Sequence, residues 1–220
     1  WVLDEQPVLG PRTDVVWNGI VPREQAGHAL ASGRTFRSEV GCTASGMVCV
    51  AMVGRVNRLK GQALLVEAAT WLWRQGVRNV VFVLVGSPPN GQEHYLENLR
   101  KRVADSPARA RIVLRDFQED IWPVWEGCDI AVVPSTEPES FGLVAIEAMS
   151  SGKPVVAAGH GGLLDIVADG ETGCLVPPND VVALASALRR LIEAPALRER
   201  MGEAGRSRQA ARFSLGAQID

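Results

Sequence analysis

The sequence predicts an α/β protein built on a doubly wound, Rossmann-like parallel sheet. Six short runs of apolar, mostly β-branched residues recur along the chain, and longer stretches with helical spacing separate them. Most of the runs are continuously apolar instead of alternating, which is typical of strands buried on both faces. Strand–helix alternation of this kind builds βαβ units with right-handed crossovers, so we expect one parallel sheet covered by helices.

The elements follow one another in order along the chain. The predicted strands are 47–53, 80–85, 110–114, 129–133, 154–157 and 173–176. The predicted helices are 61–75, 91–104, 119–127, 142–151, 162–168, 179–193 and 196–211. Asn179 and Asp180 are suited to cap the first of the last two helices, and Pro195 separates that pair.

Two parts are expected in the chain, a connecting segment (1–46) and a Rossmann-like domain (47–220). The first part contains an apolar patch that ends at Trp17 and is closed by the turn dipeptide Asn18-Gly19. Residues 22–46 show no clear periodicity, and we expect a connection with at most short structure there. Because the chain starts at Trp1 and lacks a signal-like apolar stretch, we expect a piece cut from a longer protein.

Composition and charge exclude several classes of protein. Of the 220 residues, 46% are hydrophobic and 22% are charged, so the chain can bury a sizeable core and is not disordered. The net charge of -2 argues against nucleic acid as a partner and against a strongly basic membrane-binding surface. No run of 18 apolar residues predicts a membrane span.

Cysteine and histidine spacing argues against a structural metal site or a disulfide framework. The three histidines are scattered, and no two cysteines have C-x-x-C spacing. We expect buried thiols in a reducing compartment. The four cysteines are Cys42, Cys49, Cys128 and Cys174.

A basic, glycine-bracketed loop follows the first predicted strand. Gly54 and Gly61 enclose Arg55 and Lys60 just before a helix, and backbone amides at a helix start favour anions. The two cations would add charge-assisted hydrogen bonds of about 1.5–3 kcal/mol each, so a phosphate or diphosphate is the expected partner. The spacing is not that of a Walker A loop, since no Ser or Thr follows to hold magnesium. A solvated basic loop is the alternative.

Two glutamates follow the fourth predicted strand. Glu139 falls in the loop, Glu147 lies inside the next helix, and Ser140 is positioned to cap that helix. A carboxylate accepts two hydrogen bonds from a vicinal diol, so Glu147 suits a ribose and Glu139 suits the hydroxyls of a second polar group. The alternative is an ordinary acidic helix start that complements the helix dipole.

A glycine-rich turn, Gly159-His160-Gly161-Gly162, follows the fifth predicted strand. It lets backbone approach a ligand closely, or it is simply a tight turn. We expect His160 to be a packed loop histidine and not a catalytic base. All three loops leave the carboxyl ends of strands, the edge where an open α/β sheet binds its ligand.

Taken together, these motifs resemble the C-terminal domain of a group 1 retaining glycosyltransferase with the GT-B fold. The resemblance runs from Val15 to about Ser214. It rests on the runs VVWNGI, VGRVNRLKG, CDIAVVPSTEPESFGLVAIEAMSSGKPVVA and GGLLDIVADGETGCLVPPND. The order of the E-x7-E pattern, the embedded FG and the following EAM-x-x-G-x-PV is specific to this family.

The resemblance implies that the chain binds the donor, a UDP-, GDP- or ADP-sugar, and that the acceptor site lies in an absent N-terminal domain. It implies that Arg55, Lys60 and Glu139 serve catalysis, the first two at the diphosphate and the third at the donor sugar. The implied nucleotide-binding residues are Gly54, Arg115, Asp116, Ser140, Phe141, Gly142, Leu143 and Glu147, with Arg115 and Asp116 near the base. Asp116 replaces a common glycine, so the choice of base stays open.

The resemblance also implies transfer with retention of anomeric configuration, with no cofactor and no metal. The expected setting is the cytoplasm, where the full-length protein could associate peripherally with the inner face of a membrane. This piece alone is expected to transfer little or no sugar. Two other functions stay open: a non-catalytic nucleotide-binding or assembly module, and half of a sugar-nucleotide epimerase.

Overall fold

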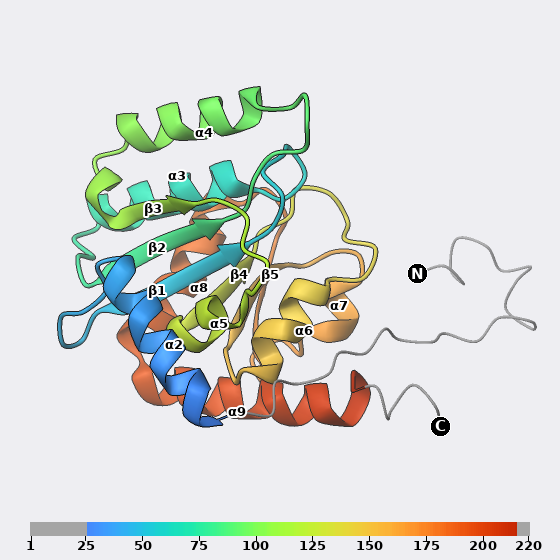
Figure 1. The fold of residues 1–220 in the computed structure, drawn as a ribbon. Coiled ribbons are helices and arrows are strands. Elements are labelled where there is room, and N and C mark those ends of the chain that lie inside the picture. Colours follow the sequence, from blue (N-terminus) through green and yellow to red (C-terminus); the bar gives the residue numbers. More distant parts are fainter. Residues whose placement is uncertain (1–25, 215–220) are drawn as a thin grey trace, which may run out of the picture.

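The computed structural model describes residues 26–214, in which a six-stranded, fully parallel sheet lies between two layers of helices (Figure 1). The strand order is β3-β2-β1-β4-β5-β6. This order confirms the predicted doubly wound sheet, and each observed strand overlaps its predicted range. The strands are β1 (Val48–Val53), β2 (Val80–Val85), β3 (Ile112–Arg115), β4 (Ile130–Val133), β5 (Val155–Ala158) and β6 (Gly173–Val176).

The helices cover both faces of the sheet. One face carries α3 (Gln62–Arg74), α4 (His94–Asp105) and α8 (Val181–Glu193). The other face carries α2 (Ala26–Glu39), α5 (Trp122–Gly127), α6 (Leu143–Ser150) and α7 (Leu163–Ile166). The long helix α9 (Pro195–Arg212) packs against α6, α8 and β6, and the short 3-10 helix η2 (Arg109–Arg111) precedes β3.

The two-sided burial of the strands explains their continuously apolar sequences. In β1, Val48, Val50 and Met52 belong to the core under α3 and α8, whereas Cys49 and Ala51 belong to the core under α5 and α6. Successive strand residues point to opposite faces, so a strand covered on both sides needs apolar residues at every position. Strand β2, which lies between β1 and β3, is buried along its whole length.

Helix α2 corrects the expectation that residues 22–46 hold at most short structure. It packs against α5, where Gly33 approaches Glu126 so closely that a Cβ would lie 2.9 Å from its carbonyl carbon. Phe36 fills the matching space beside Gly127. The helix therefore packs as part of the sheet domain. In other respects, the expected division into residues 1–46 and 47–220 stays a prediction.

The structure also bears on the predicted helix cap and on the predicted buried cysteines. Asp180 caps α8 by accepting a hydrogen bond from the Ala183 amide at 2.8 Å, as predicted. The four cysteines are free and buried, and burial raises the pKa of the Cys128 thiol to about 12. The turn at Asn18-Gly19 lies outside the described residues. Between residues 26 and 214, no helix combines the length and the hydrophobicity that a bilayer crossing needs.

Candidate functional site

The site lies where the order of the strands reverses, between the neighbouring strands β1 and β4. Residues 54–61 leave the carboxyl end of β1, and residues 134–142 leave the carboxyl end of β4. Gly61 has a φ of 80°, and a Cβ there would lie 2.0 Å from the carbonyl oxygen of Pro134. Only glycine allows this approach, which holds the two loops against each other.

Hydrogen bonds within the β1 loop aim Lys60 at the β4 loop. The Asn57 side-chain oxygen accepts from the amides of Leu59 and Lys60 at 3.0 and 3.1 Å. The side-chain amide of the buried Gln62 donates to the backbone carbonyl of Arg55 at 2.9 Å. Across the loops, the Thr136 amide donates to the Leu59 carbonyl at 2.8 Å. The loop is therefore shaped by the protein itself.

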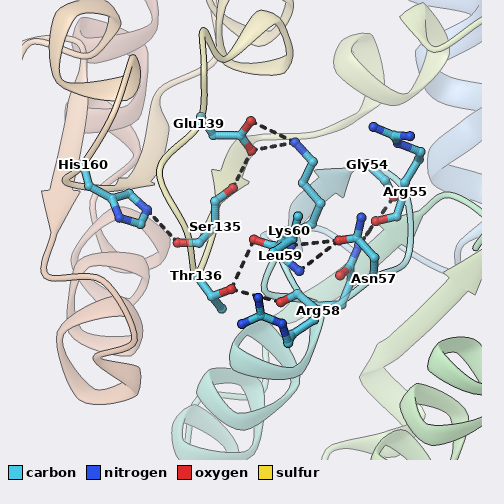
Figure 2. A network of polar contacts seen from close by, with 11 residues as sticks. Gly54, Arg55, Asn57, Arg58, Leu59, Lys60, Ser135, Thr136, Glu139 and His160 are labelled. Carbon is cyan, nitrogen blue, oxygen red and sulfur yellow. Dashed lines mark hydrogen bonds and ion pairs between the residues drawn. The ribbon is translucent and has the colours of Figure 1, made fainter. Parts of the chain in front are cut away.

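Lys60 and Glu139 form the central ion pair of the site. The Lys60 Nζ donates to both carboxylate oxygens of Glu139, at 2.7 and 2.9 Å, as Figure 2 shows. The Ser135 hydroxyl donates to Oε1 of the same carboxylate at 2.5 Å. Only 25% of the Lys60 side chain and 13% of the Glu139 side chain are exposed, so water screens this pair less than a surface pair.

The β5–α7 turn braces the loop that carries Glu139. His160 Nε2 lies 2.9 Å from the carbonyl oxygen of Ser135, and because a carbonyl only accepts, this nitrogen carries the proton. The Gly162 amide donates to the Glu139 carbonyl at 2.8 Å, beside a β-bridge between Glu139 and Gly161. His160 is thus the packed loop histidine that the sequence predicts.

The N-terminus of α6 faces Lys60 across a cavity of about 260 Å³, named here the Lys60 cavity. Gly142 is the N-cap with a φ of 103°, and no side chain caps the helix, so the prediction that Ser140 caps it is wrong. An N-cap glycine leaves the first amides, of Leu143 and Val144, without a capping oxygen. The residues of this cavity that the sequence predicts are Lys60, Glu139, Ser140, Phe141, Gly142 and Leu143.

A second cavity, of about 330 Å³, meets the first at Val53 and is named here the Phe117 cavity. Its wall is mostly apolar and includes Pro88, Phe117 and Ile121, and it also contains Gly54 and Arg55. The Phe117 side chain is 66% exposed, which is unusual for so large an apolar group. The basic loop contributes Lys60 to the Lys60 cavity and Gly54 and Arg55 to the Phe117 cavity.

Three predicted residues line neither of these cavities. Arg115 pairs with Glu39 of α2 at 2.8 Å, and Asp116 lines neither cavity. Glu147 lies under the α6 surface beside Trp125, and burial raises its pKa although the indole N–H has a smaller opposite effect. Glu147 Oε2 and Trp125 Nε1 are buried, and neither has a hydrogen-bond partner within the described part of the chain.

The chemistry of the site is that of anion and hydroxyl recognition. Uncapped helix amides and two cations favour a phosphate, and a braced carboxylate accepts from hydroxyl groups. In residues 26–214, no group of three His, Cys, Asp or Glu side chains is arranged to hold a metal ion.

Comparison with known proteins gives the family. The family model described as "Glycosyl transferases group 1" matches residues 44–208. The chain belongs to this family. A D-inositol 3-phosphate glycosyltransferase from Corynebacterium diphtheriae is 39% identical over 172 residues, which are 76% of this chain and 39% of the relative. An alpha-D-kanosaminyltransferase from Streptomyces kanamyceticus is 35% identical over 78% of this chain and 43% of the relative.

Solved structures of group 1 glycosyltransferases and related enzymes share the fold. HepE from Anabaena, solved with UDP and glucose, superposes with a TM-score of 0.84 at 27% identity, covering 94% of this chain and 54% of HepE. The C-terminal domain of LpcC from Francisella tularensis, a group 1 family protein, gives a TM-score of 0.71 at 25% identity, covering 88% and 95% of the two chains. The chain thus corresponds to a group 1 C-terminal domain with the GT-B architecture, and it spans less than half the length of the curated relatives.

The sequence reasoning missed several residues of this group 1 site. Ser135, His160 and Gln62 act through side-chain hydrogen bonds to distant loops, and sequence spacing gives no signal for such bonds. Phe117 did carry a signal, because it is an isolated aromatic residue in the polar run RDFQED after a strand. That Arg115 and Asp116 lie near the base stays a prediction, and Phe117 is the neighbouring residue that lines the Phe117 cavity.

Proposed function

We propose that the chain is the donor-binding half of a retaining glycosyltransferase that takes its sugar from a nucleoside diphosphate sugar. The observation that carries this proposal is the position of Lys60, which faces the uncapped start of α6 at the β1–β4 switch point. Both features attract the same anion, and Glu139 next to them accepts from hydroxyl groups. Solved complexes of HepE with UDP and with UDP-glucose support a ligand of this class.

The two cavities divide the proposed donor into three parts. The base would occupy the apolar Phe117 cavity, where an aromatic ring can stack on it. The diphosphate would lie between Arg55, Lys60 and the amides of α6, and the sugar would meet Glu139 in the Lys60 cavity. The ribose would lie between base and diphosphate, on the side of Glu147. No metal is needed in this scheme, because the cations and the helix start supply the positive charge.

The proposed reaction breaks the bond between the anomeric carbon and the diphosphate oxygen. The sugar becomes oxocarbenium-like, and negative charge grows on the diphosphate, where Lys60, Arg55 and the α6 amides stabilise it. The acceptor oxygen forms the new bond on the same face, and its proton passes to the leaving phosphate oxygen. Retention by this route requires no protein nucleophile. Glu139 suits a positioning role, since Lys60 and Ser135 already occupy its oxygens.

The acceptor would bind to the other half of a longer protein. We therefore expect this chain alone to bind the donor and to transfer little sugar. The lengths of the relatives support this expectation, because the chain matches only 39% of the first relative. A cytoplasmic location and a peripheral contact with a membrane stay predictions. NMR analysis of the product anomer, with the full-length protein, would test retention.

Thermal unfolding of the chain with UDP, GDP and ADP tests the binding proposal. A ligand at ten times its Kd stabilises the folded state by about 1.4 kcal/mol, which is a measurable shift in Tm. We expect one nucleotide to give this shift and Lys60→Ala to abolish it. The matched control is Arg58→Ala, which removes a cation from the same loop, where Arg58 pairs with Glu137 at the surface. No shift with any nucleotide, or equal losses in both variants, would contradict the proposal.

A further inference from the structure

Lys60 and Glu139 form an ion pair with each other. Both carboxylate oxygens accept from the same Nζ, at 2.7 and 2.9 Å, and both side chains are largely shielded. An ammonium group has three donors, and two of them are directed at Glu139. A phosphate that binds Lys60 must therefore compete with Glu139 for hydrogen bonds.

Glu139 cannot easily move aside to release Lys60. Its carboxylate accepts from the Ser135 hydroxyl, and Ser135 is only 1% exposed. The Ser135 carbonyl is in turn held by His160 (Figure 2). The Glu139 carbonyl accepts from the Gly162 amide. Two loops thus fix the carboxylate at both its side chain and its backbone.

We propose that this braced ion pair makes the site select sugar nucleotides against the free nucleoside diphosphate. The proposal rests on the proposed function of the same site. A nucleoside diphosphate draws Lys60 away from Glu139 and brings its terminal phosphate charge toward a carboxylate that then keeps only the Ser135 hydroxyl as a donor. A sugar nucleotide carries less charge at that phosphate, and its sugar hydroxyls donate to Glu139 in place of Lys60.

The consequence for turnover follows from the same geometry. After transfer, the sugar hydroxyls have left, and the remaining diphosphate faces the unpaired carboxylate. Re-formation of the Lys60–Glu139 pair then competes with the product for the same ammonium hydrogens. The ion pair therefore lowers the affinity for the product more than the affinity for the donor.

Glu139→Gln tests this proposal because it keeps the shape of the side chain and removes its charge. Calorimetric titration with UDP and UDP-glucose, and with the GDP-mannose and ADP-glucose pairs, gives the two affinities for each variant. We expect Glu139→Gln to bind the free diphosphate about tenfold more tightly than wild type, as for one charge-assisted hydrogen bond. The ratio of diphosphate Kd to sugar-nucleotide Kd should fall about tenfold or more.

Glu137→Gln is the matched control, since it makes the same change two residues away at an exposed ion pair with Arg58. It should leave both affinities and their ratio at the wild-type values. Thermal unfolding checks that each variant folds, and Glu139→Ala repeats the test with a second side chain. Because Ala removes the same charge, the free diphosphate should again bind more tightly.

Two results would separate the possible failures. If wild type binds nucleotides but Glu139→Gln and Glu139→Ala bind the free diphosphate no more tightly, the ion pair does not oppose phosphate binding and this inference is overturned. A weaker affinity in both variants would show that Glu139 instead positions Lys60 for phosphate. If wild type binds none of the six ligands, the proposed function fails, and the inference fails with it.

Discussion

Glu147 is a partly buried carboxylate on α6, and its environment makes a prediction at the scale of a single residue. Burial raises its pKa from the ordinary value of 4.5, and the Trp125 N–H offsets this only in part. The folded state then holds the proton more tightly than the unfolded state, so this residue's contribution to stability is greatest at low pH and is lost as pH rises through the raised pKa. At neutral pH the buried charge therefore destabilises the fold.

Glu147→Gln removes this ionisation. We expect the variant to be more stable than wild type at pH 7. The difference should shrink as pH falls through the raised pKa and vanish below 4.5, where Glu147 is protonated in both states. Urea unfolding at several pH values measures this, with the exposed Glu203→Gln in α9 as the control. A Glu147→Gln variant that is equally or less stable at pH 7 would contradict the burial argument.

At the scale of elements, the approach of the two loops depends on Gly61. Alanine there meets both the strained φ of 80° and the Pro134 carbonyl oxygen, whereas Gly76, with a φ of 86°, has open space around it. Left-handed backbone costs about 1–2 kcal/mol for a side chain, and overpacking adds about 1–3 kcal/mol. We expect Gly61→Ala to lower the free energy of unfolding by about 1–3 kcal/mol more than Gly76→Ala does. We also expect Gly61→Ala to weaken nucleotide binding.

Chemical denaturation of both variants measures the difference. Similar losses of stability would mean that the contact with Pro134 is not a constraint on the fold. A stable Gly61→Ala protein with wild-type nucleotide affinity would show that the close contact between the two loops is not needed for nucleotide binding.

One arginine of helix α2 donates several hydrogen bonds to the sheet domain, in addition to the packing of α2 on α5. Arg37 donates to the Asp129 carboxylate at 2.8 Å and to the carbonyls of Gly127 and Met47 at 3.0 and 2.8 Å. We expect Arg37→Ala to cost about 2–3 kcal/mol, because charged hydrogen bonds are lost and the Asp129 carboxylate keeps only the Cys49 amide as a donor. The exposed Arg34→Ala should change stability by no more than about 0.5 kcal/mol. Equal effects of the two substitutions in urea unfolding would argue that α2 is only loosely attached.

Prediction from sequence succeeded for elements whose burial is uniform. The strands β2 and β4 are apolar at every position because both faces are covered, and this pattern is visible in one sequence. Helix α2 was missed because its contact with α5 uses Gly33 and Gly127, and small residues leave no apolar periodicity to detect. The Ser140 cap was wrong because the chain takes a left-handed turn at Gly142 before α6 begins.

The location of the site could be predicted from the sequence, but the contacts between its side chains could not. Lys60 and Glu139 could be assigned to one sheet edge because the carboxyl ends of parallel strands converge. Their mutual ion pair could not, since it depends on the contact between Gly61 and Pro134, which lie 73 positions apart in the printed sequence. The bond from Ser135 to Glu139 likewise depends on how the β4 loop folds back.

At the scale of the whole molecule, the charge distribution predicts nucleotide binding without a divalent metal. Arg55, Lys60 and the start of α6 gather at one edge of a chain whose net charge is -2. We expect the affinity for the preferred nucleoside diphosphate to agree within about twofold in EDTA and in magnesium, because protein groups provide the compensating charge. Calorimetry in both buffers measures this, and a loss of binding in EDTA would mean that a metal ion completes the site.

The central claim is that the β1–β4 edge of this group 1 domain binds the diphosphate of a nucleotide. Backbone NMR of the chain during titration with UDP, GDP or ADP tests it most directly, because each amide reports its own surroundings. We expect the largest shift changes in residues 54–61 and at the Leu143 and Val144 amides, with little change in α9 at the base of the domain. Changes confined to other surfaces, or none with any of the three nucleotides, would contradict the claim.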